Sequence, residues 1–78
     1  MTKILTNMVV IGGICKAFRL SLGVKQIDVA YELGYSLENI SSFENGRNDN
    51  YRIFMWYLSK GLTFDKIQRL SKEWEEWT

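Results

Sequence analysis

Apolar residues recur at helical spacing in the first part of the chain. Five of them fall at i, i+3, i+4, i+7 and i+11, which places them on one face of a helix from about residue 9 to 22. They are Ile11, Ile14, Cys15, Phe18 and Leu22. Gly12 and Gly13 weaken the beginning of this helix, because glycine is a poor helix former.

Glycines divide the rest of the chain into pieces of helical length. They are Gly23, Gly34, Gly46 and Gly61. A glycine just past the last periodic residue is a common helix terminator. The second piece, about 25–33, carries four apolar residues: Ile27, Val29, Ala30 and Leu33. The third follows Ser36, a good N-cap with Asn39 three residues later, and has Leu37, Ile40 and Phe43.

Two further helices complete the pattern. The fourth piece, about 50–60, has Tyr51, Phe54 and Tyr57 as its predicted core residues. The fifth begins after Thr63 as N-cap, with Asp65 in its first turn, where the helix dipole favours an acid. Its apolar stripe consists of Ile67, Leu70, Trp74 and Trp77. We therefore predict an all-α fold of five short helices in a single domain, residues 1–78.

Composition supports one small core and excludes several kinds of chemistry. The 78 residues are 46% hydrophobic and contain no proline, which suits a mostly helical domain. A single cysteine, Cys15, excludes an internal disulfide, and we expect it to be a small buried side chain. Histidine is absent, which excludes His-containing metal sites and Ser-His or Cys-His nucleophile pairs. We expect no catalytic site, no metal and no cofactor.

No apolar run reaches the roughly 18 residues that a membrane span needs. Lys16 and Arg19, which follow the apolar stretch 8–14, argue against a secretion signal. We expect a cytoplasmic protein, of a bacterium or a phage-infected cell.

Residues 25–46 have the layout of two short helices joined by a turn that contains glycine, the unit that places a second helix in the DNA major groove. The segments VKQIDVAYELGYS (24–36) and ISSFENGR (40–47) resemble the two halves of the motif of Cro/C1-type helix-turn-helix proteins, the xenobiotic-response-element family. The resemblance covers roughly residues 14–70. It implies a lambda-repressor-like domain with its motif at about 25–46. The aromatic helix that the apolar stripe predicts, at about 63–77, is then the C-terminal helix of that domain.

The resemblance also implies a function and site residues. Such proteins are small sequence-specific DNA-binding transcriptional regulators of phages and mobile elements, which act by operator occupancy and often as homodimers. Ala30 and Ile40 match buried positions that set the angle between the motif helices, and Arg19 and Glu44 match a structural ion pair. The implied DNA contacts are Lys25, Gln26, Ser36, Leu37, Glu38, Asn39, Ser42, Arg47 and Asn48.

The charges in this region depart from what DNA binding requires. Residues 24–50 contain two basic and five acidic residues, a net charge of −3, and no cation lies between Ser36 and Asn45. Phosphate neutralisation by cations supplies most of the non-specific affinity for DNA. Leu37 and Glu38 can still read bases, because a leucine packs on the thymine methyl group and a glutamate accepts from cytosine N4.

A second hypothesis therefore stays open: a helix-turn-helix domain repurposed for protein–protein binding, as an anti-repressor, co-repressor or host-factor inhibitor. The acidic segment 24–50 favours it, and so does Leu37, which we expect to be exposed. So do the surplus large residues at 53–58, which cannot all face one small core. The predicted partners are double-stranded DNA, a second copy of the chain and a protein bound through the acidic motif or the last two helices, with no membrane. Candidate interface residues are Trp56, Trp74 and Trp77.

Overall fold

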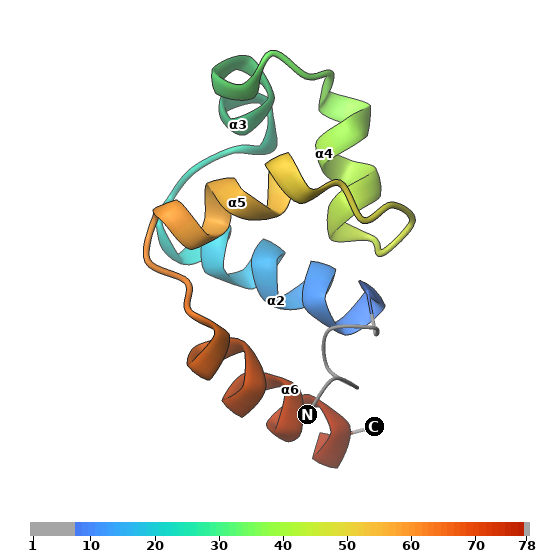
Figure 1. Ribbon diagram of the computed structural model, residues 1–78, viewed down its shortest axis with the longest axis vertical. Helices are drawn as coiled ribbons and strands as arrows, with labels where there is room; N and C mark the ends of the chain where they lie inside the picture. The colour runs from blue at the N-terminus through green and yellow to red at the C-terminus, as the bar shows by residue number, and fades with distance from the viewer. Residues whose placement is uncertain (1–7, 78) are drawn as a thin grey trace.

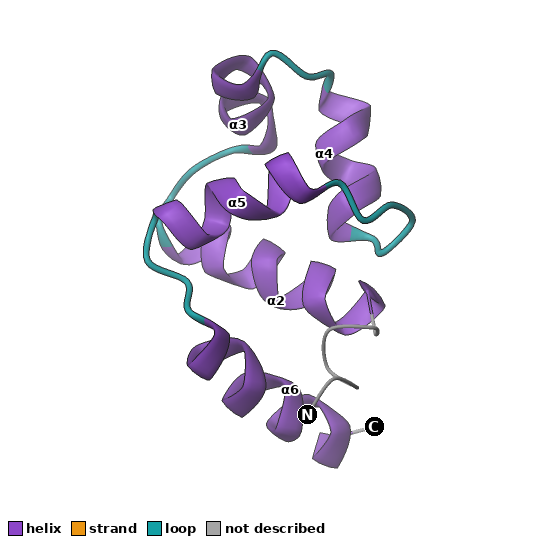
Figure 2. Ribbon diagram, in the orientation of Figure 1, coloured by secondary structure: helices purple, strands orange, loops and turns teal. Residues whose placement is uncertain are grey.

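The computed structural model describes the backbone of residues 8–77 and the side chains of residues 8–70 and 72. This part of the chain forms five helices and no strand (Figure 2). They are α2 (Met8–Ser21), α3 (Gln26–Leu33), α4 (Leu37–Glu44), α5 (Tyr51–Ser59) and α6 (Phe64–Trp77). The predicted all-α class with five helices is confirmed, and each helix lies where the hydrophobic pattern places it.

Helix α2 is the centre of the arrangement, because it packs against α4, α5 and α6 (Figure 1). Helices α3 and α4 pack against each other and form one end of the molecule, while α6 lies at the other end. The fold is therefore a small helical cluster in which the α3–turn–α4 unit stands at one end, supported from below by α2 and α5.

The core draws on every helix and on the α5–α6 connection. Phe43 of α4 stacks on Tyr57 of α5, with ring centroids 5.7 Å apart. Cys15 is fully buried among apolar side chains, and this burial raises the pKa of its thiol to about 12. The remaining buried apolar residues are Val10, Ile11, Ile14, Val29, Ala30, Ile40, Ile53, Trp56, Leu62 and Ile67.

Capping side chains fix the starts of several helices, among them α4 and α6. The Ser36 hydroxyl accepts from the Asn39 backbone N–H, and the Asn39 side-chain oxygen accepts from the Ser36 N–H, both at 3.2 Å. This is a capping box closed by asparagine in the place of the usual glutamate. The Thr63 hydroxyl accepts from the Lys66 N–H at 3.1 Å and so begins α6. Gly34 ends α3 in the left-handed conformation, with φ of 76°, which favours glycine.

Gly12 has a role that its poor helix propensity conceals. Helix α2 runs unbroken through it from Met8. A Cβ atom on Gly12 would lie 2.5 Å from the Glu44 carbonyl oxygen and 2.6 Å from that of Phe43. Those distances are far below van der Waals contact, so only glycine lets α2 approach the end of α4 this closely.

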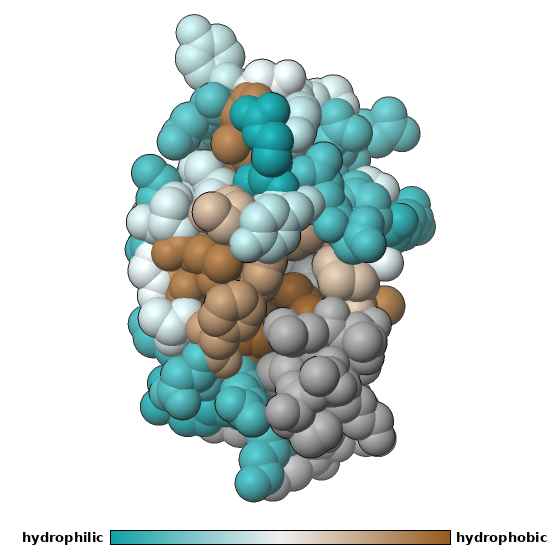
Figure 3. All heavy atoms as spheres, viewed as in Figure 1, coloured by the Kyte–Doolittle hydropathy of each residue, from teal (hydrophilic) through white to brown (hydrophobic). Residues whose placement is uncertain are grey.

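The structure corrects several predicted side-chain positions. Trp56, a predicted interface residue, is only 5% exposed, because it lies on the side of α5 that faces the core. Tyr51, predicted to be in the core, is 66% exposed on the opposite side of the same helix. Leu22 and Ile27 are exposed too: Leu22 follows the end of α2 and leaves its apolar face. Apolar side chains gather on the surface over α5 (Figure 3). The other two interface candidates, Trp74 and Trp77, lie outside the described side chains.

Candidate nucleic-acid interface

A buried ion pair ties α2 to the end of α4. The Arg19 Nε atom lies 2.8 Å from Oε2 of Glu44, and Arg19 Nη2 donates to Oε1 at 3.1 Å. Arg19 Nη1 also donates to the Val24 carbonyl at 2.7 Å, so the same guanidinium holds the connection between α2 and α3. Both charged residues are less than 5% exposed. This pair fixes where the α3–turn–α4 unit sits on α2.

Two further donors complete the shell of the Glu44 carboxylate. Gln26 donates from Nε2 to Oε1 at 2.9 Å, and the Tyr57 hydroxyl donates to Oε2 at 2.5 Å. Burial alone would raise the pKa of Glu44, but the hydrogen bonds from Arg19, Tyr57 and Gln26 outweigh it and hold that pKa below its ordinary value. The same burial and the adjacent carboxylate raise the pKa of Tyr57. Glu44 is therefore an ionised, fully engaged internal group.

Two other acidic residues of the 24–50 segment are also engaged within the protein. Glu32 accepts from the Trp56 indole N–H at 3.1 Å, and its second oxygen lies 3.8 Å from Lys60 Nζ, so it is turned toward α5. Asp28 accepts from the Lys25 backbone N–H at 3.3 Å and caps the start of α3. Three of the five acids of this segment therefore bond within the protein, although Asp28 and Glu32 remain exposed to solvent.

The α3–turn–α4 unit is built as the sequence predicts. Its turn is residues 34–36, closed by a hydrogen bond from the Tyr35 N–H to the Ala30 carbonyl at 2.9 Å. Ala30 and Ile40 are buried where the two helices meet. At the start of α4, Ser36, Leu37, Glu38 and Asn39 are exposed, with Leu37 at 46%, and Ser42 is half-buried. The expected recognition positions are therefore accessible, although the Asn39 side-chain oxygen is already used in the cap.

A shallow groove brings some of these residues together with Lys16, a basic residue outside the motif, and with two apolar residues that the sequence did not identify as contacts. It runs over the second half of α2 and the starts of α3 and α4, and is here called the α2–α3–α4 groove. Its lining includes three of the predicted DNA contacts, which are Leu37, Lys25 and Gln26. Lys16, Leu20 and Ile27 line it as well. Leu20 follows Lys16 by four residues and is exposed on the same face of α2, which is the signal that could have identified Leu20.

Arg47 and Asn48, the other expected phosphate contacts, lie in the α4–α5 connection and do not line this groove. The Arg47 side chain is exposed, and the backbone N–H of Arg47 donates to the Ser42 carbonyl at 2.9 Å. Asn48 is used locally: its side-chain oxygen accepts from the Asn50 N–H at 3.0 Å. Arg47 is therefore free to contact a ligand, whereas Asn48 shapes the loop.

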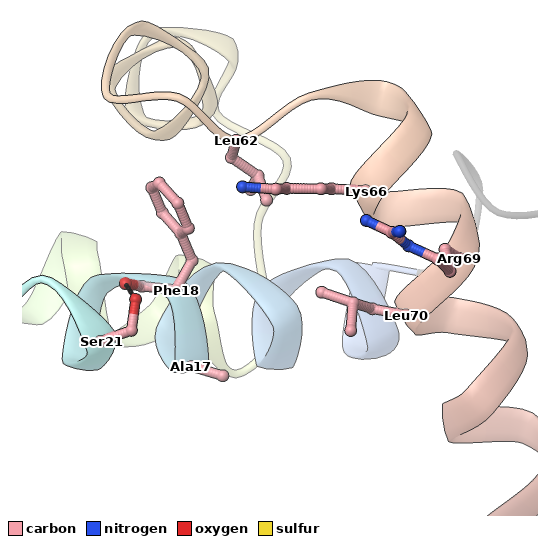
Figure 4. A pocket seen from close by; sticks show the side chains of 7 residues that line it. All are labelled: Ala17, Phe18, Ser21, Leu62, Lys66, Arg69 and Leu70. Atoms are coloured by element: carbon pink, nitrogen blue, oxygen red, sulfur yellow. Dashed lines mark hydrogen bonds between the residues drawn. The ribbon is translucent and has the colours of Figure 1, made fainter.

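A second groove lies between α2 and α6 (Figure 4). Phe18 and Leu62 form its apolar part, and Lys66 and Arg69 of α6 border it. Lys66 Nζ lies 6.0 Å from the centre of the Phe18 ring. Across residues 8–70 and 72, no group of three or more His, Cys, Asp or Glu side chains is placed to hold a metal ion.

Comparison with protein-family models, with curated proteins and with solved structures finds no match for this chain. The resemblance to Cro/C1-type proteins remains a prediction from the residues. None of the five described helices combines the length and the apolar character that crossing a bilayer requires.

Proposed function

We propose that this protein is a small sequence-specific DNA-binding regulator, in which the α3–turn–α4 unit works as a helix-turn-helix of the Cro/C1 type and α4 enters the major groove. One observation carries the proposal. Three of the five acidic residues that oppose DNA binding in the linear sequence, Asp28, Glu32 and Glu44, bond within the protein, and Glu44 is buried, whereas the exposed start of α4 stays accessible.

The charge presented at the proposed DNA interface then differs from the net charge of −3 that residues 24–50 carry in the sequence. Glu44 is neutralised by Arg19, Glu32 lies against Trp56 and Lys60, and Asp28 binds the backbone. On the exposed surface of α4 before its last residue, Glu38 is the one acidic side chain. Lys16 and Lys25 border the groove that Leu37 lines, and they supply positive charge beside the reading helix.

The exposed residues at the start of α4 have the chemistry to distinguish base pairs. Leu37 presents an apolar surface that fits a thymine methyl group, and Ile27 beside it in the groove extends that surface. The Glu38 carboxylate is an acceptor, which matches the N4 amino group of cytosine. We expect each such contact to contribute about 1–3 kcal/mol of discrimination against the wrong base.

Selection from random duplex DNA by the purified full chain tests this proposal. We expect an enriched sequence. Its affinity should fall with salt because cations displace counterions from phosphates, with a logarithmic slope of about −0.9 for each phosphate contacted. Three contacts, from Lys16, Lys25 and Arg47, predict a loss of about 40-fold between 50 and 200 mM salt for each copy of the chain.

The control is the Tyr31→Ser variant, because Tyr31 is 90% exposed on α3 and lies outside the groove. It should enrich the same sequence as the natural chain. The double variant Lys16→Ala/Lys25→Ala lacks two of the three expected phosphate contacts. If the natural chain enriches no sequence and binds DNA at 50 mM salt as weakly as this double variant, the proposal is wrong.

A second function is favoured by the apolar character of the same groove. Leu20, Ile27 and Leu37 are exposed there together, and a surface of that kind suits an apolar segment of another regulatory protein. The protein would then act as an anti-repressor, co-repressor or host-factor inhibitor. This second function predicts that the natural chain enriches no DNA sequence. It also predicts that Leu37→Ser abolishes capture of such a partner.

A further inference from the structure

A hollow opens between the start of α2, the α4–α5 connection and the starts of α5 and α6. It encloses about 250 Å³, just below the roughly 300–1,000 Å³ of typical ligand pockets, which suits a small ligand. Four of the seven residues that line it are aromatic and only one is charged. The lining residues are Met8, Ile11, Phe43, Asp49, Tyr51, Phe54 and Phe64, and this site is here called the aromatic hollow.

Packing within the protein holds the rings of the aromatic hollow in place. Phe43 is fully buried and stacks on Tyr57, with ring centroids 5.7 Å apart. The Phe54 ring lies 6.2 Å from that of Phe43. The Phe64 ring lies 6.1 Å from that of Phe54, and the planes of these two rings meet at 66°. The rings therefore form a continuous wall that is not flat and that the fold itself positions.

Asp49 is the charged residue of the aromatic hollow. It is exposed, and across the described residues no hydrogen bond or ion pair engages its carboxylate. The nearest cations along the chain, Arg47 and Arg52, do not line the hollow. The Arg52 guanidinium lies 5.4 Å from the centre of the Tyr35 ring, and Arg52 borders a different hollow. The aromatic hollow therefore presents one free carboxylate beside its rings.

Aromatic rings beside a free carboxylate favour one class of ligand. The face of an aromatic ring attracts a cation that lies within about 6 Å of its centre, and groups of rings recognise quaternary ammonium ligands in this way. A methylated ammonium group carries its charge under an apolar surface. It therefore enters an apolar hollow at a smaller cost of desolvation than a metal ion or a primary ammonium group. The Asp49 carboxylate repels anions, and a neutral apolar ligand gains nothing from it.

We propose that the aromatic hollow binds a small organic cation with a methylated ammonium group. The ammonium group lies against the rings of Tyr51, Phe54 and Phe64, and Asp49 is its counter-ion. This site goes beyond DNA binding and does not depend on it, because no residue of the aromatic hollow lines the α2–α3–α4 groove.

Proton nuclear magnetic resonance of choline mixed with the purified full chain tests the proposal. The matched control compound is 3,3-dimethyl-1-butanol, which has the shape of choline but carbon in place of the charged nitrogen. We expect the methyl resonance of choline to move upfield as protein is added, because ring currents shield protons that lie over aromatic faces. Choline should bind at least about tenfold more tightly than the neutral compound, since several rings and one carboxylate act on its charge.

Variants of the chain test the two parts of the site. Asp49→Asn removes the charge at nearly constant size and should weaken choline binding about two- to fivefold. Phe64→Leu keeps an apolar side chain and removes one half-exposed ring, and Tyr51→Leu does the same on α5; each should weaken binding about two- to fivefold. Tyr31→Ser removes a ring that is 90% exposed on α3, outside the hollow, and should leave binding unchanged. Circular dichroism checks that every variant folds.

Four results would overturn the proposal. They are a choline resonance that does not move, equal binding of choline and the neutral compound, and binding that Asp49→Asn and both ring variants leave unchanged. The fourth is tighter binding of a peptide that contains trimethyl-lysine, since the ligand would then be a protein side chain and not a small compound. Each readout is taken without DNA, so its outcome is separate from that of the DNA-binding experiment.

Discussion

Replacing Glu44 with Gln tests the part of the structure that holds the α3–turn–α4 unit in place. The carboxylate receives two hydrogen bonds from Arg19, one from Gln26 and one from Tyr57. A glutamine of nearly the same shape keeps a single acceptor oxygen and presents an NH2 group to donors. Arg19, which is 4% exposed, would then be a buried charge without a counter-ion.

The expected loss of stability is large compared with the total. Breaking one partner of a buried ion pair costs about 3–5 kcal/mol. A domain of 78 residues has a free energy of unfolding of about 4–12 kcal/mol, at 0.05–0.15 kcal/mol per residue. Glu44→Gln should therefore remove about a quarter or more of the stability. Tyr57→Phe, which removes one donor and no charge, should cost only about 1–3 kcal/mol.

Urea denaturation followed by far-ultraviolet circular dichroism, repeated from pH 7 to pH 3, measures this effect. The pKa of Glu44 is lowered in the folded state, so its ionised form stabilises the fold above the ordinary glutamate pKa of about 4.3. That contribution is lost as the pH falls through the folded pKa. The stability difference between the natural chain and Glu44→Gln should therefore be greatest near pH 7 and shrink in acid.

Two results would refute this reasoning. The first is a cost below about 1 kcal/mol at pH 7, the value of an ordinary exposed pair. The second is a difference that stays constant from pH 7 to pH 3, since it would show that the charge of Glu44 is not what the variant removes. If Glu44→Gln does not fold, Arg19→Met/Glu44→Leu gives the comparison, because removing both charges should cost less than removing one.

Three further predictions concern packing. Gly12→Ala should destabilise by about 1–3 kcal/mol through the clash with α4, despite the better helix propensity of alanine. Gly23→Ala has open space around it but φ of 74°, and should cost about 1 kcal/mol. A urea midpoint of Gly12→Ala equal to that of the natural chain would contradict the predicted clash. The Cys15 thiol, buried and with its pKa raised to about 12, should react with a thiol reagent only as fast as the protein opens; immediate labelling of the native protein would show that it is accessible. Trp56→Phe should lose the hydrogen bond to Glu32 and about 0.5–1.5 kcal/mol, and Glu32→Gln should keep most of that stability.

The sequence predicts the helices well because their ends are marked by local chemistry. Ser36 and Thr63 cap the helices that follow them, and Gly34 ends α3 by adopting a conformation that other residues avoid. These signals act within a few residues and do not depend on tertiary packing. Asn39 shows the limit: it replaces the glutamate of a capping box, and the structure was needed to show that it closes the box.

The sequence predicts much less about which face of α5 is buried. Nearly every residue from Ile53 to Leu58 is large and apolar, so the helical period disappears and either side could face the core. Packing against α2 and the hydrogen bond from Trp56 to Glu32 decide the rotation. The sequence also does not predict where the charges of this segment lie. A count of acids along 24–50 cannot show that Glu44 is buried and that Glu32 is turned toward α5.

The central claim is that the exposed start of α4 reads DNA bases, and a change of specificity tests it most directly. The measurement is selection of random duplex DNA by the natural chain and by Glu38→Gln in parallel. A glutamate accepts from cytosine, whereas a glutamine pairs best with adenine, so one position of the enriched sequence should change from cytosine to adenine while the others stay the same. Identical enriched sequences, or no enrichment by the natural chain, would contradict the claim.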